Sequence, residues 1–292
     1  MIQKWFPSSD THSPIKQKGI LASKIILIIS VVGIFFYAIY SLPYYGDWDH
    51  VYYHVGQSPL APYSVHGFLN SPWMAWILAP FTTLPPHLSG AVWMTLAVLL
   101  TVWSMHRLQA GMLAILLCLL SPAFIRYITS GQIGIVPLLG FIFLLTYEQI
   151  PMKGLGLVLM SVKPQVLGAG ALSYWLNLDR HHKIWVALPL AVLILLSLLM
   201  YGFWPLQINP TELNQTVDMS PWPYGIPVGL LVLGWSIWKN KPIWGGLATY
   251  LLVPYVSPSS IFIYTAVLFS KAPKWVSIII FVLLWAFALL YT

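Results

Sequence analysis

Two acids in one short stretch of the chain, residues 44–73, could carry out acid–base chemistry. Asp47 and Asp49 flank Trp48 just after a long apolar run, and the sequence holds only seven acidic residues in total. Two neighbouring carboxylates in a partly dehydrated site favour either one general base or a shared cation. The alternative is that they only keep an external loop in water. We favour a chemical role for the two acids, because acidic residues are scarce in this sequence and costly near a membrane.

The same stretch holds histidines and aromatic side chains. His50, His54 and His66 could join the acids as ligands of zinc or manganese. Their spacing matches no metal motif, so we expect no metal and no cofactor. Aromatic side chains could stack on a sugar or could form the aromatic belt found at membrane interfaces. The aromatic residues in question are Trp48, Tyr52 and Tyr53.

Two basic residues could bind an anion. Lys163 interrupts an apolar run instead of flanking one, and a lysine near membrane depth usually has an anionic partner. With Arg126 it could hold a phosphate or diphosphate, assisted by the N-terminal end of a helix after Pro164. The alternative for Lys163 is a side chain that extends to the lipid headgroups. Gln132 follows a glycine at the start of an apolar run, where its amide could cap a helix or contact a ligand.

Composition places the chain among membrane proteins. Hydrophobic residues make up 59% of the sequence and charged residues 7%, with a mean hydropathy of +0.79. Apolar runs long enough to cross about 30 Å of hydrocarbon recur along the chain. The net charge of +7 comes from basic residues scattered between these runs, which excludes a nucleic-acid patch. The single cysteine, Cys118, excludes an intramolecular disulfide and a thiolate metal site.

We therefore expect an all-α, polytopic transmembrane bundle with about 9 to 11 membrane helices, some short or broken. A cytoplasmic tail, residues 1–23, should precede one membrane-embedded domain, 24–292, whose external loop 44–73 carries the site. Residues 73–84 could either cross the membrane or form a short interfacial helix. The expected helices are 24–43, 88–105, 109–124, 131–149, a pair within 154–176 broken at Lys163 and Pro164, 184–203, 223–239, 242–256, 258–270 and 275–291.

The basic residues predict the orientation. Lysines before the first helix place the N-terminus in the cytoplasm by the positive-inside rule. The basic turns 180–183, 239–241 and 271–274 should lie on that side as well. Asp47, Arg126, Gln132 and Lys163 then fall together on the outer face of the cell membrane, provided that residues 73–84 do not cross.

Several blocks of the sequence resemble a known family. In order, the blocks are GDWDHVYY, APYSVHGFLNSPWMAWILAPFTTLP, SGQIGIVPLLG, SVKPQVLGAGAL, and MSPWPYGIPVGLLVL with LVPYVSPSSIF. Their order and spacing over about residues 25–270 resemble the membrane glycosyltransferases of family 87. That family belongs to the GT-C superfamily of enzymes that use polyprenyl-phosphate sugars.

The resemblance implies a multi-pass GT-C fold and a hexosyltransferase. Such an enzyme transfers a sugar, typically mannose, from a polyprenyl-phosphate donor to a lipid or glycan acceptor of the cell envelope. By this resemblance, Asp47 matches the catalytic acid of the family, and Asp49 is the second candidate for that role. Lys163 matches the lysine that binds the donor phosphate. Arg126 is the second candidate for the phosphate. The candidates for substrate contact are Trp48, His50, Tyr52, Tyr53, Asn70, Trp73, Gln132 and Trp222.

Two other classes remain open. Broken helices with a buried lysine also describe the substrate sites of transporters, so the chain could be a transporter or a lipid-handling membrane protein. It could also be a non-catalytic membrane partner of a larger enzyme. No inverted repeat is apparent in the sequence, and the polar residues gather on one side instead of at the midplane. We therefore favour the transferase.

Overall fold

The computed structural model describes residues 14–208 and 218–291, and within these ranges the chain is all-α with no strand. The first residues of the expected N-terminal tail, 1–13, lie outside the described part. The α-helices are α1 (Pro14–Tyr40), α2 (Tyr53–Gln57), α3 (Trp73–Leu78), α4 (Pro86–Arg107), α5 (Met112–Leu119), α6 (Pro122–Ser130), α7 (Ile135–Thr146), α8 (Ile150–Met160), α9 (Gly168–Leu176), α10 (Arg180–Tyr201), α11 (Ile226–Trp238), α12 (Pro242–Leu252), α13 (Ile261–Lys271) and α14 (Lys274–Tyr291). Short turns join them: the π-helical turn η1 (Trp48–Tyr52) and the 3₁₀ turns η2 (Pro62–Ser64), η3 (Phe81–Thr83), η4 (Trp204–Gln207) and η6 (Pro258–Ser260).

Helices α4 and α10 are long and apolar enough to cross a membrane, with 22 residues each. At 1.5 Å per residue each would rise about 33 Å, which matches the hydrocarbon thickness. Helices α5 and α6 pass the same test as a pair bent by 54° and could form a third span. The length and apolar composition of these helices indicate a membrane protein. Several shorter apolar helices accompany the candidate spans.

The expected single helix 109–124 is wrong, because the structure breaks it. Helix α5 ends at Leu119, and α6 starts at Pro122 and continues to Ser130. The Ser121 hydroxyl caps α6 by accepting a hydrogen bond from the backbone N–H of Phe124 at 3.2 Å. Proline at the first helical position lacks the N–H that would continue the preceding helix. A Ser-Pro pair therefore ends one helix and starts the next.

The structure also bears on one expected broken helix and on one alternative that the sequence left open. The expected pair within 154–176 forms as α8 and α9, separated by residues 161–167 around Lys163 and Pro164. Residues 73–84 form only the six-residue α3 and the turn η3. A helix of six residues rises about 9 Å, far less than the hydrocarbon thickness, so α3 is too short to cross.

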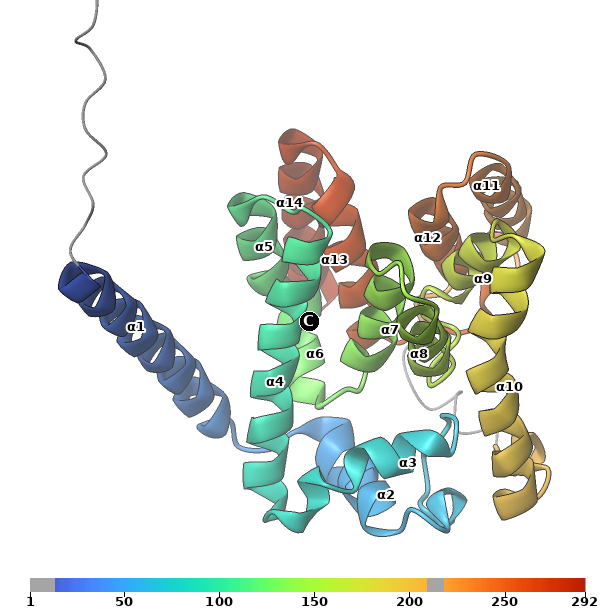
Figure 1. The fold of residues 1–292 in the computed structure, drawn as a ribbon, viewed down its shortest axis with the longest axis horizontal. Helices are drawn as coiled ribbons and strands as arrows, with labels where there is room; N and C mark the ends of the chain where they lie inside the picture. The colour runs from blue at the N-terminus through green and yellow to red at the C-terminus, as the bar shows by residue number, and fades with distance from the viewer. Residues whose placement is uncertain (1–13, 209–217, 292) are drawn as a thin grey trace, which may run out of the picture.

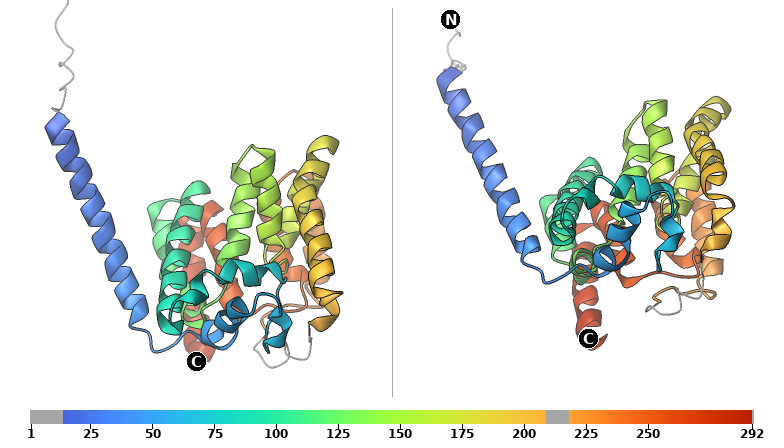
Figure 2. Two further views of the ribbon diagram at one scale, coloured as in Figure 1. Left: turned by 60° about the horizontal axis from the view of Figure 1, so that its bottom comes forward. Right: turned by 90° about the horizontal axis from the view of Figure 1, so that it is seen from below.

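The helices pack side by side, with connecting segments at two opposite ends of the bundle (Figure 1). One end holds the segments that follow α1, α6, α8 and α12. The other end holds the α4–α5, α11–α12 and α13–α14 turns. Helix α1 leans away from the other helices and meets them near its C-terminal end, where it contacts α4 (Figure 2).

Glycines set the closest helix contacts. A Cβ atom on Gly140 of α7 would lie 2.6 Å from the carbonyl oxygen of Gly156 in α8. A Cβ atom on Gly170 of α9 would lie 2.6 Å from the backbone nitrogen of Gly246 in α12. Small residues let helix backbones approach closely inside membranes. These two contacts fix α8 and α9, and with them the segment between them that carries Lys163.

Candidate functional site

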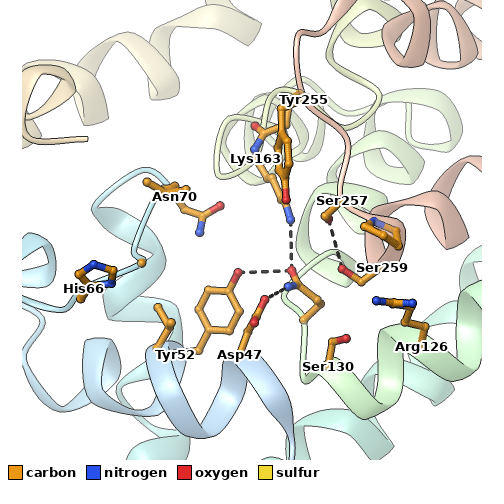
Figure 3. A pocket seen from close by; sticks show the side chains of 16 residues that line it. Asp47, Tyr52, His66, Asn70, Arg126, Ser130, Lys163, Tyr255, Ser257 and Ser259 are labelled. Atoms are coloured by element: carbon orange, nitrogen blue, oxygen red, sulfur yellow. Dashed lines mark hydrogen bonds between the residues drawn. The ribbon is translucent and has the colours of Figure 1, made fainter. Parts of the chain in front are cut away.

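A cavity of about 440 Å³ opens at the end of the bundle where the polar segments meet. Its walls come from the η1 turn, the loop before α3, the end of α6 and the segments 161–167 and 253–260 (Figure 3). Six of the predicted site residues line it: Asp47, Tyr52, Asn70, Arg126, Gln132 and Lys163. Residues that are distant in sequence therefore share one cavity.

Close backbone packing positions Asp47. The π-helical turn that follows it lies against the end of α6, where Gly131 ends the helix with φ of 64°. A Cβ atom on Gly131 would lie 2.5 Å from the Cβ atom of Trp48, and one on Gly46 would lie 3.1 Å from the Cα atom of Ser130. Glycine is the residue that tolerates both the positive φ and the contact. The Asp47 carboxylate is thereby held toward the cavity.

Gln132 connects the acid to the lysine. Its Nε2 group donates a hydrogen bond to Oδ2 of Asp47, and its Oε1 atom accepts one from Nζ of Lys163 at 3.1 Å (Figure 3). The Tyr52 hydroxyl donates to the same Oε1 atom at 3.4 Å. An ammonium group can only donate, which fixes the orientation of the amide. The indole N–H of Trp93 donates to the backbone oxygen of Gln132 at 3.2 Å and holds its main chain.

Hydrogen bonds to the loop before α3 position Lys163. The backbone N–H of Ser71 donates to the carbonyl oxygen of Val162 at 3.3 Å, and the Ser71 hydroxyl donates to that of Ser161 at 2.6 Å. These bonds join the Lys163 segment to Asn70, which is buried beside it. Asn70 and Lys163 therefore face the cavity from one continuous wall.

Burial shifts the proton affinities of both charged groups in this network. Neither group lies in one of the candidate membrane spans. Burial lowers the pKa of Lys163 to about 8, although the charge of Asp47 acts in the opposite direction. Burial raises the pKa of Asp47, and the charges of Lys163 and His50 counteract part of that rise. A carboxylate with a raised pKa binds a proton more readily, so it is better suited to accept one in a reaction.

Arg126 faces the same cavity from α6 (Figure 3). Its side chain is exposed, in contrast to buried Lys163. Hydroxyl groups of Ser257 and Ser259 lie nearby in the lining, with 3.2 Å between the two oxygens. Two cations and two hydroxyl groups around one space are the groups that bind phosphate oxygens in proteins.

The other predicted site residues do not line the cavity. Asp49 points elsewhere, since its Oδ2 atom accepts a hydrogen bond from the backbone N–H of Tyr45 at 2.8 Å. Trp48 is fully buried and stacks on Trp93 with ring centroids 5.4 Å apart, so it cannot stack on a sugar in this cavity. The complete set outside the lining is Trp48, Asp49, His50, Tyr53, Trp73 and Trp222.

The cavity also contains residues that the sequence did not single out as site residues. Tyr255 and Gln165 face it, together with Ser130 and the serines of the 253–260 segment. Asp218 shapes this wall from outside, because its Oδ1 atom accepts hydrogen bonds from the backbone N–H groups of Val256 at 3.0 Å and Ser220 at 2.8 Å. The available signal was the polar run from Ser257 to Ser260 between two apolar runs, where the sequence predicts the start of the helix 258–270.

Among the described residues, one cluster of side chains that could bind a metal ion lies outside the cavity lining. Asp179, His181 and His182 have potential ligand atoms within 4.8 Å of one another at the start of α10. The cavity lining itself contributes only Asp47 and His66 of this type. The lining therefore offers too few such side chains for a three-ligand site, and its chemistry is that of a carboxylate facing cations.

No family model, curated protein or solved structure matches the chain. The resemblance to family 87 glycosyltransferases stays a prediction that rests on the order and spacing of the sequence blocks.

Proposed function

We propose that the chain is a multi-pass membrane glycosyltransferase of the GT-C type. It transfers a hexose, mannose in the first instance, from a polyprenyl phosphate to a hydroxyl group of a lipid or glycan acceptor. One observation carries most weight: the carboxylate of Asp47 and the ammonium of Lys163 face one cavity and are bridged by Gln132. A volume of about 440 Å³ lies within the usual range of small-ligand sites.

Asp47 acts as the general base. It takes the proton of the acceptor hydroxyl while that oxygen attacks the anomeric carbon of the donor sugar. The new C–O bond forms as the bond from the anomeric carbon to the phosphate oxygen breaks, and its electron pair leaves with the phosphate. Attack from the face opposite the leaving group inverts the anomeric configuration.

Lys163 and Arg126 stabilise the negative charge that grows on the leaving phosphate. Both line the cavity, and Lys163 is buried where the low local dielectric strengthens its interaction with an anion. Gln132 keeps the lysine and the base at a fixed separation before substrate binds. No metal is needed in this scheme, because the two cations supply the positive charge.

An apolar groove supports a lipid-linked donor. The groove, about 280 Å³ in volume, lies between α8, α9 and α10 and is lined by Leu157, Met160, Pro164 and Leu190 among others. Pro164 follows Lys163 directly, so the groove and the cavity lie on either side of one short segment. A polyprenyl chain in the groove would carry its phosphate toward Lys163.

The orientation completes the proposal. The basic turns face the cytoplasm together with the N-terminus, about 9 to 11 helices enter the membrane, and the cavity opens on the external side. Donor and acceptor are then both membrane-associated substrates that meet at the outer surface.

Sugar transfer by the purified full chain tests this function. A radiolabelled polyprenyl-phosphate mannose is offered with a panel of lipid and glycan acceptors, and wild type is compared with Asp47→Asn and Asp49→Asn. Loss of a positioned general base typically costs 10²- to 10⁴-fold in rate, so Asp47→Asn should lose about that much. Asp49→Asn is the matched control, because it makes the same change two residues away on a side chain outside the cavity.

Two results would contradict the proposal. Full transfer by Asp47→Asn would remove the base from the mechanism. Absence of transfer to every acceptor, together with saturable uptake of a solute by vesicles that contain the protein, would instead favour the transporter class, whose sites also use broken helices.

A further inference from the structure

A second cavity, of about 560 Å³, lies at the end of the bundle opposite the candidate active site. It is open to one side and bordered by the turns that follow α4, α11 and α13, which Figure 1 shows at the far end of the helices from the α6–α7 connection. Nothing in the proposed transfer reaction requires this space. Its lining therefore needs a separate explanation.

Three cations from three separate turns line this basic cavity. Arg107 ends α4, Lys241 precedes α12, and Lys271 ends α13. Nζ of Lys271 donates a hydrogen bond to the carbonyl oxygen of Leu108 at 2.9 Å, which ties the end of α13 to the end of α4. An ammonium group has three donors, so two remain for a ligand.

The lining of the basic cavity contains no carboxylate. None of Arg107, Lys241 and Lys271 forms an ion pair within the described part of the chain, where the pair found is between His182 and Asp179. Glu148 follows the α7 end closely in sequence, but it does not line the cavity. Like charges gathered around one space repel one another, and a bound anion removes that cost.

Contacts within the chain order the backbone beside Lys241 and the guanidinium group of Arg107, while all three cationic side chains remain exposed. The α11–α12 turn is closed by two hydrogen bonds: the backbone N–H of Lys241 donates to the Ser236 carbonyl oxygen, and the Ser236 hydroxyl donates to that of Lys241, both at 2.8 Å. The guanidinium group of Arg107 lies 5.1 Å from the ring centroid of Tyr147. A site whose groups are already ordered loses less entropy on binding.

Apart from Thr146 and Asn240, the rest of the lining is apolar. Leu108, Leu145, Ile243 and Trp244 contribute to it, and the residue Trp244 is 46% exposed. A free inorganic anion gains nothing from such side chains, whereas the glycerol and upper acyl groups of a lipid do. Basic pockets between membrane helices at their cytoplasmic ends suit anionic headgroups.

We propose that the basic cavity binds the phosphate headgroup of an anionic phospholipid, with Arg107, Lys241 and Lys271 as its cationic contacts. This site is independent of the transferase proposal and would hold if the chain proved to be a transporter.

Native mass spectrometry of the purified full chain tests the site. Retention of phosphatidylglycerol is compared with that of zwitterionic phosphatidylcholine for wild type, Lys241→Gln and Lys271→Gln. Glutamine removes the charge in both variants. At position 271 it also keeps a hydrogen-bond donor for the Leu108 carbonyl oxygen. Each removed cation should weaken phosphatidylglycerol binding about fivefold and leave phosphatidylcholine binding unchanged.

Lys239→Gln is the matched control, because Lys239 belongs to the same turn but lies outside the lining, over the Trp238 ring at 3.8 Å. It should leave phosphatidylglycerol binding at the wild-type level. Equal losses in Lys239→Gln and Lys241→Gln would overturn the site in favour of diffuse surface charge. Displacement of the lipid by an equal concentration of inorganic phosphate would overturn the assignment to a lipid.

Discussion

Replacement of Lys163 by methionine should remove a pH-dependent contribution to folding stability. Lys163 is 8% exposed, and burial lowers its pKa from the ordinary 10.5 to about 8. Between these values the unfolded chain still holds a proton that the folded chain has released, so the free energy of unfolding rises with pH. Each tenfold change in proton affinity corresponds to about 1.4 kcal/mol, so the rise across this window is about 3 kcal/mol.

Denaturant unfolding in detergent, from neutral pH to about pH 10.5, measures this contribution. Methionine keeps an unbranched side chain without the charge, so the Lys163→Met protein should lack the rise. The unfolding free energy of wild type minus that of Lys163→Met should therefore increase by about 3 kcal/mol over this pH range. Lys239→Met is the control and should follow wild type, because Lys239 is exposed. Parallel curves for wild type and Lys163→Met would refute the burial of a charged ammonium.

The same titration predicts how a phosphate-bearing donor binds. Protonated Lys163 attracts the phosphate and neutral Lys163 does not, so donor affinity should fall as the pH rises through about 8. Donor binding by the Lys163→Met protein should be weak and should lack this fall. An affinity that is constant across the interval in wild type would separate Lys163 from donor binding.

Two further predictions concern the fold and its orientation. Gly131→Ala should destabilise the protein by about 2 kcal/mol or more, because alanine at a φ of 64° is strained and its Cβ atom would lie 2.5 Å from that of Trp48. Gly234→Ala has no atom within 4 Å of the added Cβ and should be neutral or stabilising, so equal thermal shifts would refute the packing argument. A membrane-impermeant thiol reagent should label His50→Cys in intact cells and Lys239→Cys only after permeabilisation. The reverse pattern would invert the proposed topology.

Much of the fold followed from local sequence patterns. Helices α4, α10 and α12 to α14 lie close to their expected ranges, since apolar runs and basic flanks are read along the chain without knowledge of its folding. The break around Lys163 and Pro164 was expected for the same reason. The helix 109–124 was wrong because a continuous apolar run outweighed the Ser121-Pro122 pair, whose capping bond is nevertheless a local feature.

The site was less accessible to such reasoning. Six of the twelve candidate residues line the cavity and six do not, because the sequence marks a polar or aromatic type but not the direction of its side chain. Trp48 illustrates this limit: an aromatic residue beside an acid could stack on a sugar, yet it is buried against Trp93. Tyr255 illustrates the reverse, since nothing local distinguishes it from the other tyrosines of the chain.

The sequence by itself determined that this is a helical membrane protein with scarce acids, and where many of its helices begin and end, because composition and periodicity are local properties. Only the tertiary structure decided that Asp47 and not Asp49 faces Lys163. Residues two apart on a helical turn point to different sides, so the two acids could not both face one cavity. Packing of the η1 turn against the end of α6 chose which one does, and Gln132 then joined it to the lysine.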